Sequence, residues 1–578
     1  MAGSIHSAES RTKAEKENHQ AHQTELTNKA GIEVPYYADR DGEVEPRVTL
    51  KTWVVVLILS WGYGLSFIPV PTMAAVGGNI SADLGDPTGY VWYISAWITS
   101  ITISFTIVGA NADLLGRRWF LVGGNLICFI GHIIVGAAKS SNAVVAGMAI
   151  TGFGAACCQL AAFAVGELLP NKWRHIGVVL ADAGLYVVII VLPVTARHGA
   201  ELTRWLANFY AAAAGQAISF VGLLVFYFPP AHPLGLPYAQ VFREMDYLGI
   251  FLFIGASLPI MMGIVWASVF PSTNLHVIVP LVIGSVILVL FALYEHYGKP
   301  KHPITPTAMF TAGRGRDFTA PCIALAILNM FYYSSSILWP TMINSWYTTD
   351  WRTAAILSLP QGVAIMIGGI LLSAFGSKLK NWQWQLTASV TILVIFGSLM
   401  ALATPDNKSM MIGFFFMSML GLGYGNYLCI AMCQMGVPHE QLGTSGGLAG
   451  TARFGGGAIA QAIYLAIFNS TIAKATLQLV PTAATKAGLS AADLPALLAL
   501  LGKPDFATTY NSAIVAAVTI AQKEVIRRGV QLVAYVSIPF GIVGIIACLC
   551  CKDCNDRMND KIEVYLENTE MASHNKYH

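Results

Sequence analysis

Residues 109–120 read GANADLLGRRWF, and they place an aspartate and two arginines between two long apolar segments. The preceding segment is YVWYISAWITSITISFTIV (90–108), and the following segment begins LVGGNLICFIGHIIVGAA (121–138). A charged side chain costs about 2.5–3.5 kcal/mol at the centre of a membrane helix. The pattern therefore predicts two membrane-spanning helices joined by a short charged connection at the membrane surface.

The composition of the whole chain agrees with a membrane protein. Of its 578 residues 55% are apolar and only 11% are charged, whereas soluble domains carry about 25% charged residues. The apolar residues come in runs of about 20, which is the helical length that crosses a bilayer core. Such segments must be helical because lipid offers the backbone no hydrogen-bond partners. We therefore expect an all-α membrane protein.

Fourteen segments have the length and composition of transmembrane helices. Their approximate bounds are 52–72, 89–109, 119–138, 143–165, 177–196, 205–228, 247–268, 276–294, 319–339, 354–375, 384–403, 409–433, 444–467 and 531–551. Basic residues gather in alternate loops, which are expected to be cytosolic; examples are Arg117, Arg118, Lys172, Arg174, Lys378 and Lys380. An even number of spans then places both polar tails, 1–50 and 552–578, in the cytosol, and the first has no apolar core of a signal peptide.

Three sequons and ten cysteines bear on the same topology. The candidate N-glycosylation sites Asn79, Asn407 and Asn469 all fall in loops predicted to face outward. None of the cysteines does, so no structural disulfide is expected. The cluster CLCCKDC (548–554) is open to three interpretations, which are S-palmitoylation, a four-ligand zinc site and apolar filler with incidental thiols. The last is preferred, and no bound metal or cofactor is expected.

The charged connection also resembles a known motif. Gly109, Asp113, Gly116, Arg117 and Arg118 resemble the signature loop between the second and third helices of the major facilitator superfamily, with Leu114 where an arginine commonly stands. The resemblance implies a cytosolic gating latch that holds two helix bundles together in one state. SAFGSKLKNWQW (373–384) is a degenerate echo in the corresponding loop of the second half.

Three further stretches resemble the fungal trichothecene efflux pump family, one of the fourteen-helix drug:proton antiporters, with siderophore–iron transporters as relatives. They are FIPVPTMAAVGGNISADLGDPTGYVWYISAW (67–97), GELLPNKWRHIG (166–177) and EQLGTSGGLAGTARFGGGAIAQAIY (440–464), and the likeness extends over about 50–550. It implies the major facilitator fold. Six-helix bundles would occupy 51–228 and 301–551, with a linker at 229–300 that carries an extra helix pair and an extracellular loop at 468–530.

The same resemblance implies a function. A monomer in the plasma membrane, or in a vacuolar or vesicle membrane, would export a small amphipathic toxin or drug-like secondary metabolite by alternating access, driven by proton antiport. Two departures bear on the coupling. Met148 stands where related antiporters carry an arginine in helix four, and Leu192 replaces a glycine before Pro193 in helix five.

Few ionisable residues fall inside the predicted spans. Asp182 is the candidate proton carrier, because a poorly hydrated carboxyl group binds protons more tightly; a structural aspartate is the alternative. Arg453 is interpreted as a packed structural charge, although pairing with an acid or with an anionic substrate stays open. His132 is interpreted as a satisfied histidine of the bundle, and Glu167 marks the inner end of span four.

Candidate cavity residues follow from the superfamily's layout, in which the first and fourth helices of each bundle line the pathway. Lipid exposure of an unpaired amide is costly, so these side chains are expected to face inward, either to a ligand or to another helix. They are Trp61, Tyr63, Gln159, Asn329, Tyr332, Tyr333, Tyr424, Asn426 and Gln434.

Other functions compete with export. The same architecture could import an iron–siderophore chelate by proton symport, with the long segment 468–530 over the outer mouth. A receptor that kept the fold without transporting is a further alternative. An enzyme and a nucleic-acid-binding protein are not expected, since the sequence shows no metal-ligand spacing, no nucleophile elbow and no phosphate-binding glycine loop.

Overall fold

A computed structural model describes residues 50–558 of the chain, apart from 87–88, 203, 230–236, 272, 299, 439–440 and 502–505. The two predicted cytosolic tails therefore lie outside the described residues, except for residue 50 and residues 552–558.

The described part contains fourteen helical segments that are long and apolar enough to cross a membrane. All fourteen predicted spans are confirmed, so this is a multi-pass, all-α membrane protein. The segments are Leu50–Asp83, Tyr90–Leu115, Arg117–Gly136, Ser141–Leu168, Asn171–Glu201, Leu206–Phe226, Tyr247–Ala267, Leu275–Tyr297, Thr319–Tyr347, Trp351–Leu379, Trp382–Leu402, Lys408–Met435, Leu442–Lys486 and Ser512–Cys550.

Three of the spans are interrupted rather than continuous. The first consists of α2 (Leu50–Ser66) and α3 (Pro69–Asp83), and the fourth of α6 (Ser141–Gln159) and α7 (Ala161–Leu168). The fifth consists of α8 (Arg174–Ala181) and α9 (Ala183–Glu201), with Asp182 alone between them. Interrupted helices are a common feature of transporter binding sites, because the break leaves polar groups inside the membrane.

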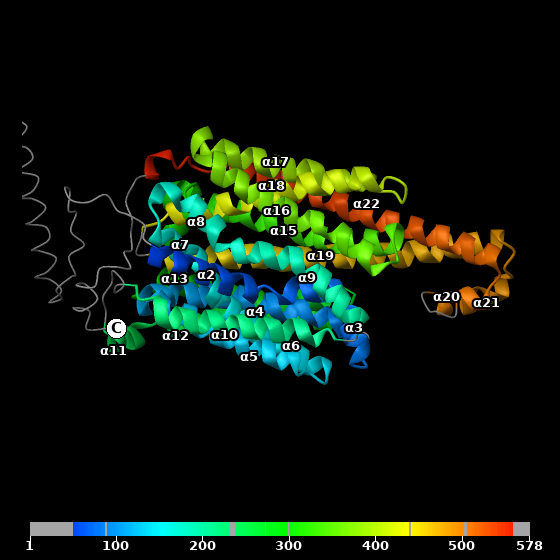
Figure 1. Ribbon diagram of the computed structural model, residues 1–578, viewed down its shortest axis with the longest axis horizontal. Coiled ribbons are helices and arrows are strands. Elements are labelled where there is room, and N and C mark those ends of the chain that lie inside the picture. Colours follow the sequence, from blue (N-terminus) through cyan, green and yellow to red (C-terminus); the bar gives the residue numbers. More distant parts are fainter. Residues whose placement is uncertain are drawn as a thin grey trace, which may run out of the picture.

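The remaining helices complete two bundles that pack against each other (Figure 1). The first bundle adds α4 (Tyr90–Leu115), α5 (Arg117–Gly136) and α10 (Leu206–Phe226). The second contains α15 (Thr319–Met342), α16 (Trp351–Leu379), α17 (Trp382–Ser398), α18 (Lys408–Met435), α19 (Leu442–Lys486) and α22 (Ser512–Cys550). The bundles meet along two seams, where α4 packs on α19 and α9 packs on α16.

Small residues bring the first seam together. A Cβ atom on Gly109 of α4 would lie 2.4 Å from the Gly443 carbonyl oxygen and 2.6 Å from the Gly447 Cα of α19. The two backbones therefore touch, as small-residue stripes allow. One turn further along, the hydroxyls of Thr106 and Thr451 are hydrogen-bonded at 2.7 Å across the seam.

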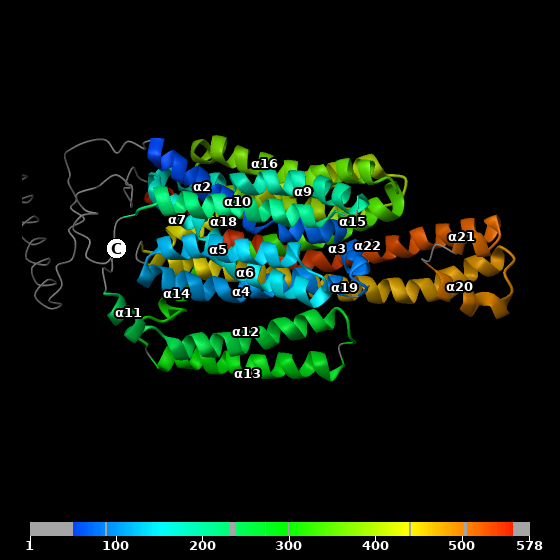
Figure 2. The same ribbon diagram turned by 60° about the horizontal axis from the view of Figure 1, so that its bottom comes forward.

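The extra helix pair lies beside this seam (Figure 2). It consists of α12 (Tyr247–Ala267) and α13 (Leu275–Tyr297), and α12 contacts both α4 and α19. Short helices α11 (Tyr238–Glu244) and α14 (Thr307–Thr311) flank it. Glu244 accepts a hydrogen bond from Lys301 at 2.8 Å, and this contact lowers the pKa of the Glu244 carboxyl group.

Most of the described part of 468–530, the predicted extracellular loop with amphipathic helical stretches, is helical. Both α19 and α22 continue past the bundle as a long hairpin, with α20 (Leu494–Leu500) and α21 (Phe506–Thr509) at its tip (Figure 1). The hairpin projects along the long axis of the molecule instead of folding over the bundle (Figures 1 and 2). A separate small core holds it together, made of Val480, Ala484, Leu497, Ile514, Val518 and Ala521.

We expect a charge in this small core to open the hairpin without unfolding the bundles. Val480 is fully buried, and burying an unpaired polar group there costs upward of about 2 kcal/mol. In Val480→Asp, trypsin should therefore cleave at Lys486 or Lys523 faster than in the parent. Leu477, which is 66% exposed, provides the matched control Leu477→Asp. Equal cleavage rates in the two variants would show that the core does not stabilise the hairpin.

Candidate functional site

The charged motif lies at the end of a helix rather than in a loop. Helix α4 continues through Asp113 to Leu115, and α5 begins at Arg117. Gly116 alone separates them, with a φ of 83° that favours glycine. The predicted loop at 109–120 is therefore wrong, and the helical register of α4 fixes the direction of the Asp113 side chain.

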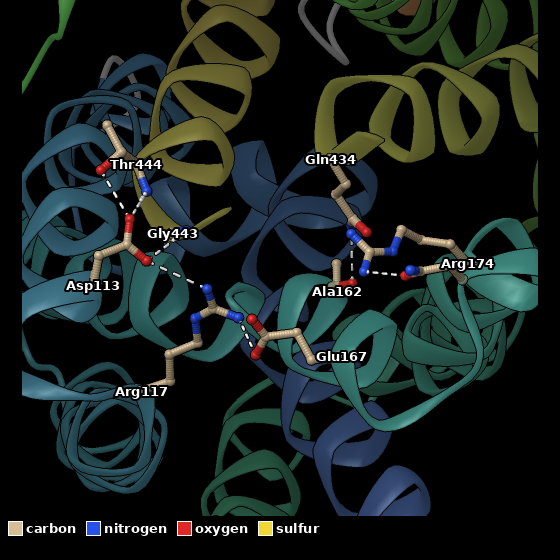
Figure 3. Close-up of polar contacts among 9 residues, drawn as sticks. Asp113, Arg117, Ala162, Glu167, Arg174, Gln434, Gly443 and Thr444 are labelled. Carbon is tan, nitrogen blue, oxygen red and sulfur yellow. Dashed lines mark hydrogen bonds and ion pairs between the residues drawn. The ribbon is translucent and has the colours of Figure 1, made fainter. Parts of the chain in front are cut away.

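Asp113 bridges the two bundles. Its Oδ1 accepts a hydrogen bond from the Gly443 backbone N–H at 2.7 Å, and its Oδ2 accepts bonds from the Thr444 backbone N–H at 2.6 Å and hydroxyl at 2.9 Å (Figure 3). Gly443 and Thr444 occupy the first turn of α19, where Gln441 makes no side-chain cap. A carboxylate from the first bundle thus caps a helix of the second and complements the positive end of its dipole.

A buried ion-pair network supports Asp113 from the first bundle. The Arg117 guanidinium donates to Asp113 at 3.3 Å and pairs with Glu167 of α7 (Figure 3). Arg174, which donates to Asn171 at 2.6 Å, also acts electrostatically on Glu167. Burial, together with the nearby Glu167 carboxylate, raises the pKa of the Tyr227 hydroxyl. The two buried carboxylates of this network, Asp113 and Glu167, therefore share the buried Arg117 cation.

The second arginine of the motif has a different partner. Arg118 donates to the Leu224 carbonyl of α10 at 3.3 Å, and its guanidinium lies 3.8 Å from the centre of the Phe228 ring. Leu224 belongs to α10 and Phe228 lies just beyond its end, so neither contact reaches the second bundle. The expectation that both arginines connect the bundles is wrong for Arg118 in this state, and Arg117 acts through Asp113.

A second contact between the bundles involves Gln434, at the end of α18. Its side-chain amide donates to the Ala162 carbonyl of α7 at 3.1 Å (Figure 3). Gln434 was expected among the cavity residues, but it lies at the same end of the molecule as Asp113. Sequence reasoning also missed Thr444 as a partner of Asp113. The sequence LGTSGG (442–447) gives a weak signal, since small and hydroxyl residues are typical of a helix start that receives an outside cap.

A second polar cluster is buried nearer the middle of the spans. The Arg453 guanidinium of α19 donates to the Tyr63 hydroxyl of α2 at 3.0 Å. Arg453 is also the cation that acts electrostatically on Asp182, which is 1% exposed. Neither Asp182 oxygen has a hydrogen bond of standard geometry among the described residues. We call Tyr63, Asp182, Arg453, Asn329 and Asn426 the central cluster.

The two asparagines link the central cluster through the second bundle. The Arg453 Nε donates to Asn329 of α15 at 3.4 Å, and the Asn329 amide donates to Asn426 of α18 at 3.3 Å. Tyr332 and Tyr333 lie beside them with their rings perpendicular at 5.2 Å. Three predicted cavity residues, Tyr63, Asn329 and Asn426, are therefore brought together, while Arg453 bridges the bundles and is more than a packed charge within one of them.

Three other predicted cavity residues lie elsewhere. Trp61 is 41% exposed on the same face of α2 as the exposed Trp53 and Leu57, so the expectation that it faces inward is wrong. Tyr424 donates to Gln385 of α17 inside the second bundle. Gln159 is buried at the break between α6 and α7, and its amide has no hydrogen bond among the described residues.

His132 and Met148 also fall outside the central cluster. His132 is fully buried and neither ring nitrogen has a hydrogen bond in the described part of the chain, so the expectation that its bonds are satisfied is wrong. Met148 is fully buried in α6, where related antiporters carry an arginine. The cation at the centre of this protein comes from α19 of the other bundle.

Two of the three sequons are not in loops. Asn79 and Asn469 are exposed residues within α3 and α19, and Asn407 directly precedes α18, where it bonds to Leu402 and Thr404. Asn79 and Asn469 were expected in loops, and this expectation is wrong because both residues are helical. Among the cysteines of the 548–554 cluster, only Cys550 is exposed. No group of three or more potential metal ligands occurs among the described residues.

The comparisons with known proteins agree with this architecture. Residues 60–576 match the model of a family described as fungal trichothecene efflux pump. The chain belongs to this family. The match continues past residue 550, where the sequence likeness was expected to end, into the C-terminal tail.

Relatives of this family member carry transporter names. The chain is 52% identical over 525 residues to the MFS-type transporter prx5 of Penicillium rubens, covering 90% of this chain and 94% of the relative. It is 23% identical to the trichothecene efflux pump TRI12 of Fusarium sporotrichioides, covering 84% and 83%, and 23% identical to the efflux pump FUS6 of Gibberella fujikuroi, covering 88% and 90%. These names agree with a transporter rather than an enzyme.

We expect loss of the Asp113 carboxylate to separate the bundles at this end of the transporter. In Asp113→Ala, the four donors that it satisfies lose their acceptor, and an unsatisfied buried donor costs about 1–3 kcal/mol. Spin labels at the exposed residues Trp119 and Leu379, one in each bundle, should report a population at longer distance by pulsed electron paramagnetic resonance.

The matched control is Asn111→Ala, because the side-chain amide of Asn111 bonds, among the described residues, only to Ile107 of its own helix. Its distance distribution should equal that of the parent. An unchanged distribution in Asp113→Ala would mean that the cap does not hold the bundles together.

Proposed function

We propose that this transporter is a secondary active exporter of a small amphipathic secondary metabolite, driven by proton antiport through alternating access. The observation that carries the proposal is the central cluster, in which Arg453 of the second bundle bonds to Tyr63 of the first and acts electrostatically on the buried Asp182 carboxylate of the first. The names of two relatives, a trichothecene efflux pump and an efflux pump, support the export direction.

The proton step follows from the charges of the cluster. While Asp182 is ionised, it attracts Arg453, and this attraction in a medium of low dielectric constant draws the two bundles together. Protonation of Asp182 removes the attraction but leaves the Arg453 cation, which Asn329 of its own bundle continues to solvate. The bond from Arg453 to the neutral Tyr63 hydroxyl then has to break for the bundles to separate, without the attraction of the carboxylate to oppose it, so proton binding and bundle position are coupled.

The position of Asp182 suits this role for a structural reason. It lies alone between α8 and α9, where its ψ of 3° departs from regular helix while helical backbone bonds still join Asp182 to Val178 and Tyr186. A helix distorted at one residue can bend there, which is how discontinuous helices serve alternating access. A carboxyl group at this hinge would alter its environment whenever the bundles move, and a change of environment changes its proton affinity.

The contacts at Asp113 and Gln434 supply the gate at one end. They close the pathway at the end that the positive-inside pattern assigns to the cytosol. In an exporter, this end closes after cargo has bound from the cytosol and stays closed while the cargo is released to the outside. Reopening would require Asp113 to leave the first turn of α19, with Arg117 and Glu167 retaining it as a buried charge of the first bundle.

The cargo class follows from the side chains around the central cluster. Tyr332, Tyr333 and the two asparagines offer aromatic faces and neutral hydrogen-bonding groups, which suit an apolar ligand with a few polar substituents. We propose Gln159 as a further contact, because its buried amide lacks a partner among the described residues. The proposal includes a monomer in the plasma membrane, or in a vacuolar or vesicle membrane, with both tails in the cytosol.

Iron–siderophore import loses its main support. That hypothesis relied on the segment 468–530 as a cover over the outer mouth, whereas the segment forms a projecting hairpin (Figure 1). A non-transporting receptor is also disfavoured, since the relatives are named transporters and efflux pumps.

We expect Asp182→Asn to abolish the dependence of transport on a pH gradient. Purified protein in liposomes would be supplied with a fluorescent amphipathic drug, and flux would be measured with and without an imposed gradient. The amide keeps the shape of the side chain but carries no exchangeable charge, so any remaining flux should be the same in both conditions.

Asp350→Asn is the matched control, because Asp350 is an exposed cap of α16 outside the central cluster. This variant should keep the gradient dependence of the parent. If Asp182→Asn also keeps it, Asp182 does not carry the proton. A parent protein that accumulates iron–siderophore chelates rather than expelling drug would contradict export itself.

A further inference from the structure

A cavity lies outside the central cluster, where both bundles meet the extra helix pair. Its volume is about 20 Å³, which is room for one water-sized group such as a hydroxyl, and its mouth is open. Three helices line it with one face each. The lining residues are Ser95, Ile98 and Thr99 of α4, Ile264, Val265 and Ser268 at the end of α12, and Ala458, Gln461, Ala462 and Leu465 of α19.

The cavity and the central cluster share α19 but use different residues of it. Trp97 of α4 packs against Phe454 of α19 with ring centres 5.6 Å apart, next to Arg453. The lining residues Thr99 and Gln461 lie on the side where α4 and α19 contact α12. A molecule in the cavity would therefore not occupy the proposed cargo site.

The side chains that line the cavity indicate what kind of molecule would bind there. None of the ten lining residues is charged. The hydroxyls of Ser95 and Ser268 already donate to carbonyls of their own helices, at 2.7 Å in each case. The Thr99 hydroxyl and the Gln461 amide make no hydrogen bond among the described residues. The cavity thus offers apolar walls and two unused polar groups, which suits an uncharged molecule that carries a hydroxyl.

The two unused groups come from different bundles. Thr99 belongs to α4 and Gln461 belongs to α19, so one molecule bonded to both would connect the bundles. Eighteen residues separate Ser95 from Asp113, which at 1.5 Å per residue corresponds to about 27 Å along α4. The cavity therefore lies towards the opposite end of the seam from the Asp113 cap.

The extra pair gives the cavity its third wall. The rings of Trp92 and Trp266 meet edge to face at 6.3 Å between α4 and α12, close to the cavity. Ser268 and Leu465 are partly exposed at its edge. An occupant could therefore come from the surrounding bilayer, and it would fill space that no side chain fills.

We propose that this cavity binds the hydroxyl head of an uncharged amphipathic molecule whose chain lies in the surrounding bilayer, and that the bound hydroxyl ties α4 to α19. Anionic lipid headgroups and metal ions lack suitable partners among the lining residues. The proposal does not depend on the direction of transport or on proton coupling.

Photolabelling tests the site directly. The full-length protein in phosphatidylcholine vesicles would be irradiated with a diazirine-bearing long-chain alcohol, and labelled peptides would be mapped by mass spectrometry. We expect labelling of peptides that contain residues 458–465 or 264–268, and competition by unlabelled hexadecanol. A diazirine-bearing long-chain amine should label these peptides less, because the cavity provides no anion.

Substitutions in the lining separate this site from general contact with lipid. Gln461→Leu and Thr99→Val each remove one hydrogen bond, so labelling should fall about fivefold. Ala462→Phe should fill the cavity and abolish labelling. The controls are Thr391→Val, whose hydroxyl bonds within its own helix, and Ile542→Phe on the exposed face of α22. Both should label as the parent does.

Thermal unfolding gives a second measurement that does not rely on labelling. A ligand that binds only the folded state raises the unfolding temperature. Hexadecanol should therefore stabilise the parent and both controls but not Gln461→Leu. Labelling that persists in Ala462→Phe and Gln461→Leu, with equal stabilisation of all variants by hexadecanol, would overturn the proposal.

Discussion

The arrangement of the bundles in this state depends on one electrostatic contact, the capping of α19 by Asp113. The first turn of a helix leaves backbone N–H groups without partners and carries partial positive charge. Here the compensating carboxylate comes from the other bundle, because Gln441 supplies no cap of its own. While the seam is closed, the Asp113 carboxylate accepts hydrogen bonds from the first turn of α19. When the seam opens, Gln441 makes no side-chain cap that would replace them. Separation of the two bundles therefore costs the free energy of capping α19.

Two properties of the seam make such a contact feasible. Gly109, Gly443 and Gly447 let the backbones of α4 and α19 touch, which brings Asp113 within hydrogen-bond distance of Thr444. These glycines bury little side chain, so the gate end of the seam can separate without breaking a large interdigitated core. Further along the seam, Trp97 and Phe105 of α4 pack on Phe454 of α19. Arg117 and Glu167 neutralise the buried charges at the gate. The gate end is therefore held by a few polar bonds.

The central cluster and the gate share α19, and this shared helix explains how they could act together. Arg453 lies nine residues after Thr444 in one continuous helix, so a shift of α19 moves both. The helix also continues into the projecting hairpin and borders the cavity beside α12. The gate, the central cluster, the projecting hairpin and the cavity therefore all include residues of α19. The cation that related antiporters place in helix four is absent at Met148, and Arg453 offers a cation from the opposite bundle.

Periodicity and composition were sufficient for the fourteen spans, because the hydrocarbon core sets helix length and forbids unpaired backbone. The motif residues around Asp113 were also recognisable, as was the candidacy of Asp182, since charges are rare inside spans. Sequence could not give the partners of these charges. Thr444, Gln434 and Arg453 lie hundreds of residues from Asp113, Ala162 and Tyr63, and their contacts depend on how the bundles pack. Likewise, the sequence of 468–530 indicates amphipathic helical stretches, but only the pairing of α19 with α22 buries their apolar side chains in one core and makes the segment a projecting hairpin.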